Sequence, residues 1–314
     1  MHHDIEQTEP NKTAKRGYSF ILIAGLFWGT TGLFIEQLTR AGASNSLISV
    51  LRVGTALILM LPIVWKSCGL AALRIPRKTL LMCVAMGFCS QTVFNICYTA
   101  AVNSVGVATS AVLLYASLFF VCIFSRIIFK EIITAHKILG ITVNIVGCVL
   151  TVTGGDFSAL SFVWFGTIMG LGAALGGGSI VIFGKILTDD THPYVITFYN
   201  LLFGFIFLLP FLAGPGAGSI SLSGRIVLLG FAMGLASACI PEVLFMTGLS
   251  HPVEASKVNV FASMEIILAS LIGIFAFHEF INAWKLVGMA LVLCSILIIN
   301  LSPAISVKQD ASEA

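Results

Sequence analysis

Charged residues are scarce in this sequence. Asp, Glu, Lys and Arg make up 10% of its 314 residues and hydrophobic residues make up 58%, so that the mean hydropathy is +1.02. An ordinary soluble domain carries about 25% charged residues, and the composition therefore excludes that class. The stretches 18–35 and 79–125 contain none of the four charged residue types. Because a membrane-spanning helix needs roughly 20 mostly apolar residues, the sequence predicts an all-α polytopic membrane protein.

Signals for a metal site, an enzyme or a secretory leader are also lacking. The 8 cysteines form no CxxC or Cys–His pair at metal-site spacing, and the 6 histidines lie in predicted tails or loops. Residues 1–17 are polar, and the apolar run after them is too long for a signal peptide. We therefore expect no metal, no cofactor and no enzyme activity. We also expect residues 1–17 to form a disordered cytoplasmic tail.

Two segments that lie 148 residues apart share one pattern. Phe, Glu, Ala, Lys and Gly of the segment 129–140 recur in register in the segment 277–288. The Leu-Pro pairs that end at Pro62 and Pro210 have the same separation. The repeat therefore extends over both halves of the chain. A duplication of this kind in a membrane protein is typical of transporters.

Charges and clusters of Gly, Pro and Asn divide the chain into ten predicted helices, five in each half. Because five is odd, the second half enters the membrane from the opposite side, which gives two inverted five-helix repeats. We expect the first repeat at 18–154, the second at 155–302 and a cytoplasmic tail at 303–314. The predicted helices are 18–39, 46–66, 79–101, 106–127, 136–154, 160–187, 192–213, 224–249, 254–277 and 283–302.

The distribution of Lys and Arg gives a predicted orientation. With a cytoplasmic N-terminus, most of these residues fall in inner segments, and Arg40, Arg225 and Lys285 are the ones in outer segments. This agrees with the excess of positive charge in cytoplasmic loops. The bias is strong in the first half and weak in the second. We expect both termini to be cytoplasmic.

Short motifs recur at specific places in these helices. Residues 26–34 read Leu-Phe-Trp-Gly-Thr-Thr-Gly-Leu-Phe and residues 50–54 read Val-Leu-Arg-Val-Gly. Glu131 and Glu279 occupy equivalent positions in the two halves, and Glu265 is followed by isoleucine. From residue 18 to residue 302, the chain resembles the EamA-type members of the drug/metabolite transporter superfamily, although many members have proline after the equivalent of Glu265.

The resemblance implies a polytopic metabolite carrier of the cell (inner) membrane, usually an exporter. It does not identify the substrate, because one fold serves many functions. We expect the lipid bilayer and a small molecule as partners and no nucleic acid, and we leave a homodimer open.

Two carboxylates are predicted to lie within the membrane. A charge at the bilayer centre costs at least about 2.5 kcal/mol, so such residues normally face a cavity or a partner. Glu265 lies near the middle of the ninth predicted helix, and Glu242 follows Pro241 in the eighth. Both are candidates for substrate binding and proton coupling, because desolvation favours the protonated carboxyl group. The alternative is a hydrogen-bonded structural glutamate or, for Glu242, a partly hydrated one.

Polar and aromatic side chains in other helices are further candidates for substrate binding. Gln91, Asn95 and Tyr98 follow the spacing i, i+4, i+7, which places them on one helix face. A polar stripe at this depth favours the lining of a cavity over hydrogen bonds between helices alone. Trp28 stands beside glycines that allow close approach, so it is either a cavity wall or a packing residue. Tyr115 is also predicted to line the cavity.

Asn259 and Ser263 complete the predicted cavity. They share one face of the ninth helix, whereas Glu265 lies about 160° further round a regular helix than Ser263. We therefore do not expect all three side chains at one spot.

Three charged residues are interpreted as structural. Arg52 stays charged in any protein environment, and we interpret it as a tie between helices, with a substrate anion as the alternative. Glu131 and Glu279 lie near the membrane surface. Their expected partners are Lys137 and Lys285, or the backbone N–H groups that begin the next helix.

These observations favour a secondary active transporter that exports a small polar metabolite, such as an amino acid or an amine, by alternating access. No ATP-binding motif is present, so gradients would supply the energy. The alternative is a proton-coupled importer of an amine or a nucleoside-like solute. A membrane protein without transport activity would leave the buried carboxylates unexplained.

Overall fold

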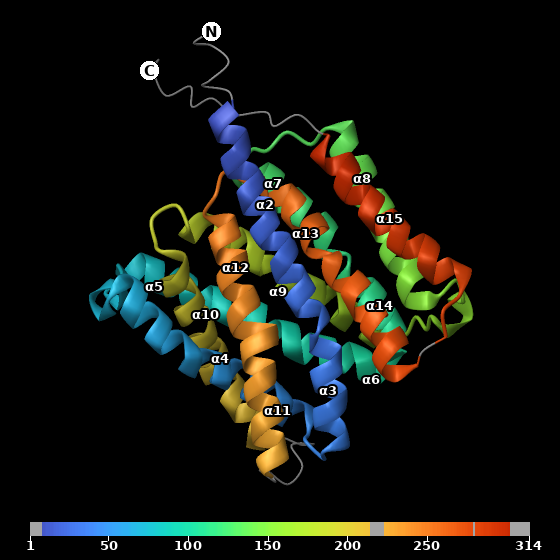
Figure 1. Ribbon diagram of the computed structural model, residues 1–314, viewed down its shortest axis with the longest axis horizontal. Helices are drawn as coiled ribbons and strands as arrows, with labels where there is room; N and C mark the ends of the chain where they lie inside the picture. The colour runs from blue at the N-terminus through green and yellow to red at the C-terminus, as the bar shows by residue number, and fades with distance from the viewer. Residues whose placement is uncertain (1–7, 214–222, 279, 302–314) are drawn as a thin grey trace.

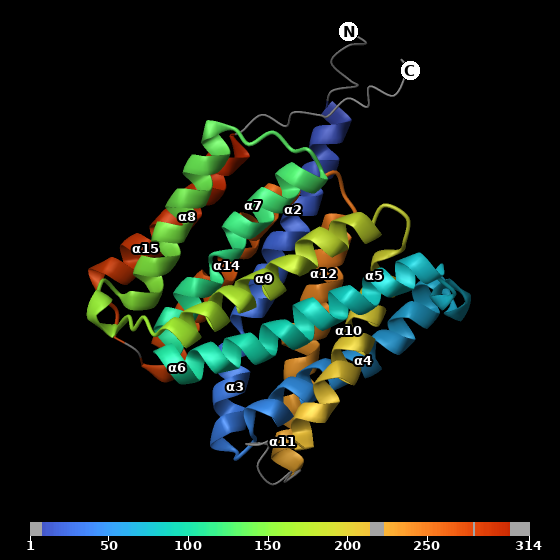
Figure 2. The ribbon, with the colours of Figure 1, turned by 180° about the vertical axis from the view of Figure 1, so that it is seen from behind.

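The computed structural model describes residues 8–213, 223–278 and 280–301. Within these ranges its regular elements are helices, and no strand is present. Figure 1 shows a bundle of tilted helices, and Figure 2 shows the same bundle from behind. The prediction of an all-α protein is confirmed.

The first half of the chain contains the helices α2 to α8. A single residue, Thr30, separates α2 from α3, so the two form one broken span. A π-helical segment, η2, joins α5 to α6. The elements are α2 (Thr8–Gly29), α3 (Thr31–Arg40), α4 (Asn45–Cys68), η1 (Leu70–Leu73), α5 (Arg77–Gly87), η2 (Phe88–Val93), α6 (Phe94–Leu114), α7 (Ser117–Ile128), α8 (Ala135–Thr153) and η3 (Phe157–Ala159).

The second half contains the helices α9 to α15. A π-helical segment, η5, joins α11 to α12, and Ser263 separates α13 from α14. The elements are α9 (Trp164–Leu187), α10 (Pro193–Leu208), η4 (Leu209–Ala213), α11 (Gly224–Gly234), η5 (Leu235–Cys239), α12 (Ile240–Leu249), α13 (Ala255–Ala262), α14 (Met264–Phe277) and α15 (Ala283–Asn300).

The number of spans agrees with the prediction of ten helices. In the part of the chain that the structure describes, 9 helical runs are long and apolar enough to span a membrane, and α7 is shorter. One run, Arg77–Leu114, has 38 residues and contains the third predicted helix and the start of the fourth. Gly106 marks the division between them with φ 81° and ψ 167°, a backbone conformation that favours glycine. The third and fourth spans therefore join without a loop, and α7 completes the fourth.

The N-terminal segment differs from the predicted disordered tail. Helix α2 begins at Thr8, so residues 8–17 are helical. Pro10 lies in the first turn, where the missing backbone N–H costs little. Residues 1–7 and the predicted tail 303–314 lie outside the described residues.

Irregular segments occur at corresponding places in the two halves. The π-helical η2 corresponds to η5, and the break at residues 115–116 corresponds to the break at Ser263. Segment η5 ends two residues before Pro241, which has no backbone N–H and therefore leaves the carbonyl group four residues earlier without its helical donor. π-helical segments are frequent at functional sites. We therefore expect a functional site near these segments, in the middle of the bundle.

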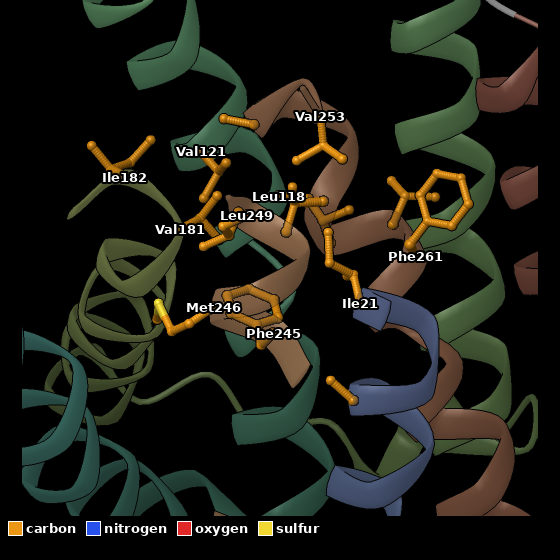
Figure 3. Packing of buried hydrophobic residues seen from close by; sticks show 14 of the residues in the cluster. Ile21, Leu118, Val121, Val181, Ile182, Phe245, Met246, Leu249, Val253 and Phe261 are labelled. Atoms are coloured by element: carbon orange, nitrogen blue, oxygen red, sulfur yellow. The ribbon is translucent and has the colours of Figure 1, made fainter. Parts of the chain in front are cut away.

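One end of the bundle, here called the ionic end, holds the buried charged residues Glu131, Lys137, Glu254 and Lys257. Helices α2 and α13 begin at this end, and α12 ends there, at the top of Figure 1. Next to it, apolar side chains of α2, α7, α9, α12 and α13 form a core that joins both halves. Figure 3 shows part of this core, including Ile21, Leu118, Val121, Val181, Phe245, Met246, Leu249, Val253 and Phe261.

Helices α8 and α15 pack side by side at the edge of the bundle (Figures 1 and 2). A Cβ atom added at Gly147 would lie 2.8 Å from the carbonyl oxygen of Gly288 and 2.8 Å from the backbone nitrogen of Val292. Glycine therefore allows the two backbones to approach closely, as is common between membrane helices.

We predict that Gly147→Ala destabilises the protein. The added methyl group meets backbone atoms that cannot move aside, and overpacking of this kind costs about 1–3 kcal/mol. The melting temperature in detergent should fall by several degrees. Gly224→Ala is the matched control, because a Cβ atom at Gly224 meets nothing within 4 Å. Equal melting temperatures for the two variants would contradict the close packing of α8 and α15.

Candidate functional site

A central cavity of about 420 Å³ lies between the two halves of the chain. Its size is in the range of small-molecule sites. Helices of both halves form its wall. Of the predicted substrate-binding residues, the structure brings together Trp28, Gln91, Tyr98, Tyr115, Glu242, Asn259 and Glu265.

Asn95 does not line the central cavity. Its amide donates a hydrogen bond to the backbone carbonyl of Gln91, and its Oδ1 accepts one from Ser49 Oγ at 3.3 Å. The prediction of a single polar stripe assumed a regular α-helix. The π-helical η2 ends between Gln91 and Asn95 and changes their angular relation, so the amide of Asn95 is directed elsewhere.

Glu242 is held by two amide side chains. Gln91 Nε2 donates to Glu242 Oε1 at 2.6 Å, and Asn200 Nδ2 donates to Glu242 Oε2 at 3.1 Å. The Asn200 side chain is itself fixed, because its Oδ1 accepts a hydrogen bond from Ser90 Oγ at 2.9 Å. With a relative exposure of 4%, Glu242 is a buried carboxylate with both oxygens bonded.

Asn200 and Ser90 are polar residues of this site that the sequence prediction did not include. Both stand inside long apolar runs, and that signal could have identified them. The contact of Asn200 with Glu242 and that of Ser90 with Asn200 could not be derived from the sequence, because each pair is separated by many residues.

Glu265 faces the same cavity without a hydrogen-bond partner among the described residues. Asn259 and Ser263 also line the cavity, although a regular helix would direct Glu265 to a different side. The break at Ser263 ends α13 and begins α14, and it resets the angular position of Glu265. All three residues therefore line one cavity, and the expectation that they do not all point at one spot stays a prediction.

Aromatic side chains form much of the remaining wall. The ring of Trp28 lies 5.0 Å from that of Phe245, and the ring of Tyr98 stacks on Phe94 at 5.7 Å. Tyr98 and Tyr115 both interact electrostatically with Glu265. A cation would meet a carboxylate and electron-rich rings in this part of the cavity.

Arg52 also lines the central cavity. It interacts electrostatically with Glu242, but in the described part of the chain it forms no hydrogen bond and no direct ion pair. This electrostatic interaction connects α4 with α12, and the interpretation of Arg52 as a tie between helices stays a prediction.

The ionic end contains Glu131 in contact with the other half of the chain. Its Oε1 accepts a hydrogen bond from the backbone N–H of Ala255 at 2.6 Å, and its Oε2 accepts one from the N–H of Ser256 at 3.1 Å. A carboxylate is favoured at a helix N-terminus. The prediction identified this kind of partner, but the helix is α13 and not the next one along the chain. Glu279 lies outside the described residues.

Lys137 connects Glu131 with Glu254. It forms an ion pair with Glu254, and its Nζ lies 3.9 Å from Glu131 Oε2. Lys257 Nζ lies 3.0 Å from Glu254 Oε1. Lys137 and Lys257 are 2% and 4% exposed. Removal of one partner from a buried ion pair costs about 3–5 kcal/mol, so this cluster holds the two halves together at the ionic end.

The central cavity is closed toward the ionic end. Its wall includes positions between 28 and 35 on the first broken helix and between 259 and 269 on the second. Leu118 and Phe245 belong both to this wall and to the core shown in Figure 3, and the rest of that core, including Val121, Leu249 and Val253, lies toward the ionic end. Tyr18 stacks on Phe261 with ring centroids 4.5 Å apart and adds to the closure.

No group of three or more His, Cys, Asp or Glu side chains within the described ranges is arranged to hold a metal ion. The polar side chains that line the central cavity carry amides, carboxylates, phenols, aliphatic hydroxyls, an indole and a guanidinium group. This chemistry suits hydrogen bonding and ion pairing with an organic molecule.

Membrane helices in two halves around one polar cavity define a class of membrane transporter. The EamA-like transporter family matches the chain at residues 15–153 and again at residues 164–301. The chain belongs to this family, and it contains two copies of the family's repeat.

Similar proteins carry transporter names. The chain is 27% identical over 284 residues to an "Uncharacterized transporter" of Archaeoglobus fulgidus, with 90% of this chain and 95% of the relative covered. It is 26% identical over 296 residues to the "Uncharacterized transporter YwfM" of Bacillus subtilis, with 94% and 96% covered. One crystal structure has the same fold with a TM-score of 0.76, 15% identity, and 90% and 96% of the two chains covered.

We predict that Glu242→Met destabilises the protein more than Glu265→Met. Loss of the Glu242 carboxylate leaves two amide donors without their acceptor and Arg52 without a nearby negative charge, which costs about 2–5 kcal/mol. Loss of the Glu265 carboxylate breaks no hydrogen bond and should leave the melting temperature unchanged or higher. Equal destabilisation by the two substitutions would show that Glu242 is not the better-held carboxylate.

Proposed function

We propose that the protein is a secondary active transporter that exports a small polar metabolite such as an amino acid or an amine. The observation that carries this proposal is the central cavity, whose wall combines Glu242 and Glu265 with Trp28, Tyr98 and Tyr115. Carboxylates and aromatic rings in one cavity suit a solute with a cationic group. Membership of the EamA-like transporter family supports the transport activity. The kind of substrate and the direction of transport are part of the proposal.

Alternating access would use the contacts between the two repeats. In the present arrangement the central cavity is closed at the ionic end by a buried core and by the ion pairs of Lys137. Glu131 and Lys137 belong to the first half, and Glu254 and Lys257 belong to the second. Opening of this end therefore separates the two repeats and breaks the ion pairs. Closure of the opposite end would then complete the cycle.

The proposed repeats are residues 18–154 and 155–302, with the ionic end on the cytoplasmic side of the cell (inner) membrane. The N-terminal Lys and Arg residues and the ionic end lie on the same side of the bundle, which supports this orientation. Both termini would then be cytoplasmic.

The second candidate function is proton-coupled import of an amine or a nucleoside-like solute. The observation that favours it is the unpartnered carboxylate of Glu265, which faces the cavity beside Tyr98, Tyr115 and Cys148. A carboxyl group in this setting could bind and release a proton once in each transport cycle.

We predict that purified protein in liposomes catalyses counterflow of an amino acid or an amine. The assay loads one unlabelled solute inside and follows uptake of its labelled form, with and without a pH gradient. Glu265→Gln should reduce uptake at least about tenfold, because a charge-assisted hydrogen bond contributes about 1.5–3 kcal/mol. Absence of counterflow for every amino acid, amine and nucleoside, in a folded sample, would contradict the proposal.

The same assay separates export from proton-coupled import. A coupled importer accumulates solute when the outside is acidic, and Glu265→Gln removes this dependence. An exporter without proton coupling shows equal counterflow at both gradients. Uptake that depends on pH equally in the wild type, Glu265→Gln and Glu242→Gln would exclude both carboxylates as the coupling group.

We predict that Lys137→Met opens the ionic end. The substitution leaves Glu131 and Glu254 buried without its ammonium group, which penalises the closed arrangement. The native Cys122 packs beside the core at this end, and its labelling by a water-soluble maleimide should rise several-fold. Mass spectrometry of peptides distinguishes it from the other cysteines.

Lys285→Met is the matched control, because Lys285 occupies the equivalent position in the second repeat and lies outside the ionic cluster. It should leave the labelling of Cys122 unchanged. Lys137→Arg, which keeps a positive charge between Glu131 and Glu254, should leave the labelling near the wild-type level. Unchanged labelling in Lys137→Met would show that the ion pairs do not control this end.

A further inference from the structure

Asn144 is a fully buried amide in α8, at the edge of the bundle. Its side-chain nitrogen carries two N–H donors, and both acceptors lie in the second half of the chain. Nδ2 donates to Ser263 Oγ at 2.7 Å and to Ser295 Oγ at 2.8 Å. Its Oδ1 accepts a hydrogen bond from Cys148 Sγ at 3.4 Å. The amide therefore uses both its donors and its acceptor.

The two serines that accept these bonds are each held at a second point. Ser263 Oγ donates to the backbone carbonyl of Val260 at 2.6 Å, and Ser295 Oγ donates to that of Val292 at 2.6 Å. Each hydroxyl group thus accepts from Asn144 and donates within its own stretch of chain. A buried polar cluster that is satisfied in this way keeps its members in one arrangement.

Ser263 is the residue that interrupts the second broken helix. It ends α13 and begins α14, and Glu265 follows in the first turn of α14. Because Glu265 comes only two residues later, the direction of its side chain depends on the backbone at Ser263. A regular helix would turn Glu265 to another side. The hydrogen bond from Asn144 therefore acts at the point that sets this direction.

The start of α14 is also held against α8 and α15. Ile266 and Ile267 of α14 form a buried cluster with Cys148 of α8 and with Met289 and Val292 of α15. The closely packed pair of α8 and α15 thus supports the broken helix in two ways. The amide holds the break itself, and the apolar cluster holds the turn that follows it.

The counterpart of this break in the first half is built differently. At a separation of 148 residues, Tyr115 takes the place of Ser263, and Ser117 takes the place of Glu265. The residue that corresponds to Asn144 is a valine. The amide and the hydroxyl group that hold a break therefore belong to the break that presents a carboxylate to the cavity.

We propose that Asn144 is a positioning residue of the central cavity: through the hydroxyl group of Ser263 it fixes the break between α13 and α14 and so keeps Glu265 directed into the cavity. The role of Glu265 in transport rests on the proposed function, whereas its positioning by Asn144 does not. A hydrogen bond that merely stabilised the packing would change the free energy of unfolding and leave the direction of Glu265 unchanged.

The test measures which way position 265 faces. The substitution Glu265→Cys places a thiol there, and the probe is trimethylammonioethyl methanethiosulfonate. This small reagent is permanently charged, so it reaches a thiol from water and not from lipid. The protein is reduced, the reductant is removed, and the rate of modification is followed by mass spectrometry of peptides, which distinguishes this thiol from the native cysteines.

Addition of Ser263→Ala should lower the rate of modification about 2- to 10-fold, the factor that corresponds to one neutral hydrogen bond. The reason is that the break can then return toward a regular helix and turn position 265 away from the cavity. Asn144→Leu should lower the rate by a similar factor. The two substitutions together should lower it no further, because they remove the same interaction.

Ser295→Ala is the matched control. It removes a hydrogen bond of the same kind from the same amide, but Ser295 lies within α15 and not at the break. The rate of modification should therefore stay unchanged. Gel filtration and the melting temperature establish that each variant is folded, and the two serine variants should lose a similar few degrees.

An unchanged rate with Ser263→Ala, or an equal fall with Ser263→Ala and Ser295→Ala, would overturn the positioning role of Asn144. If Asn144→Leu fails to fold, the comparison of the two serine variants still decides. The assay needs no transported solute. Failure of counterflow would therefore overturn the proposed function and leave this inference intact, and a negative result here would leave the proposed function intact.

Discussion

The cost of a charge that is removed from water constrains this molecule more than any other factor. A chain with 10% charged residues spans the membrane easily, but each charge that remains inside needs a partner or a hydrated cavity. The structure meets this requirement in two ways. At the ionic end, Glu131, Lys137, Glu254 and Lys257 pair with one another across the two repeats. In the central cavity, Glu242 is held by amides, whereas the side chains of Arg52 and Glu265 form no hydrogen bond with the residues that the structure describes.

These two groups of charges have different consequences. The ion pairs at the ionic end are satisfied only while the repeats are together, so they stabilise the arrangement that is closed at that end. Under the proposed transport function, a solute with a cationic group would supply the charge that Glu265 lacks in the cavity. A transporter needs both groups of charges. The ion pairs stabilise one conformation, and the charges in the cavity make the relative energy of the conformations depend on whether solute is bound.

The sequence predicted the helical class and the two repeats, and seven of its eight candidate substrate-binding residues line one cavity. Long apolar runs and a pattern that recurs in both halves can be read directly from the sequence. A polar residue inside an apolar run normally faces a cavity or a partner. The prediction did not extend to irregular backbone. The break at Ser263 brings Glu265 to the same cavity as Asn259, and the π-helical η2 directs Asn95 away from it. Contacts between repeats, such as Glu131 with the N-terminus of α13, depend on tertiary packing that no local pattern encodes.

Amide hydrogen exchange at both ends of the bundle tests the central claim, that the two repeats open one end while they close the other. The backbone N–H groups of Ala255 and Ser256 are bonded to Glu131 at the ionic end, and residues 31–35 of α3 lie toward the opposite end. With a transported amino acid present on both sides of the membrane, exchange at residues 255–256 should become faster while exchange at residues 31–35 becomes slower. Exchange that stays constant, or that changes in the same direction at both ends, would contradict alternating access between the repeats.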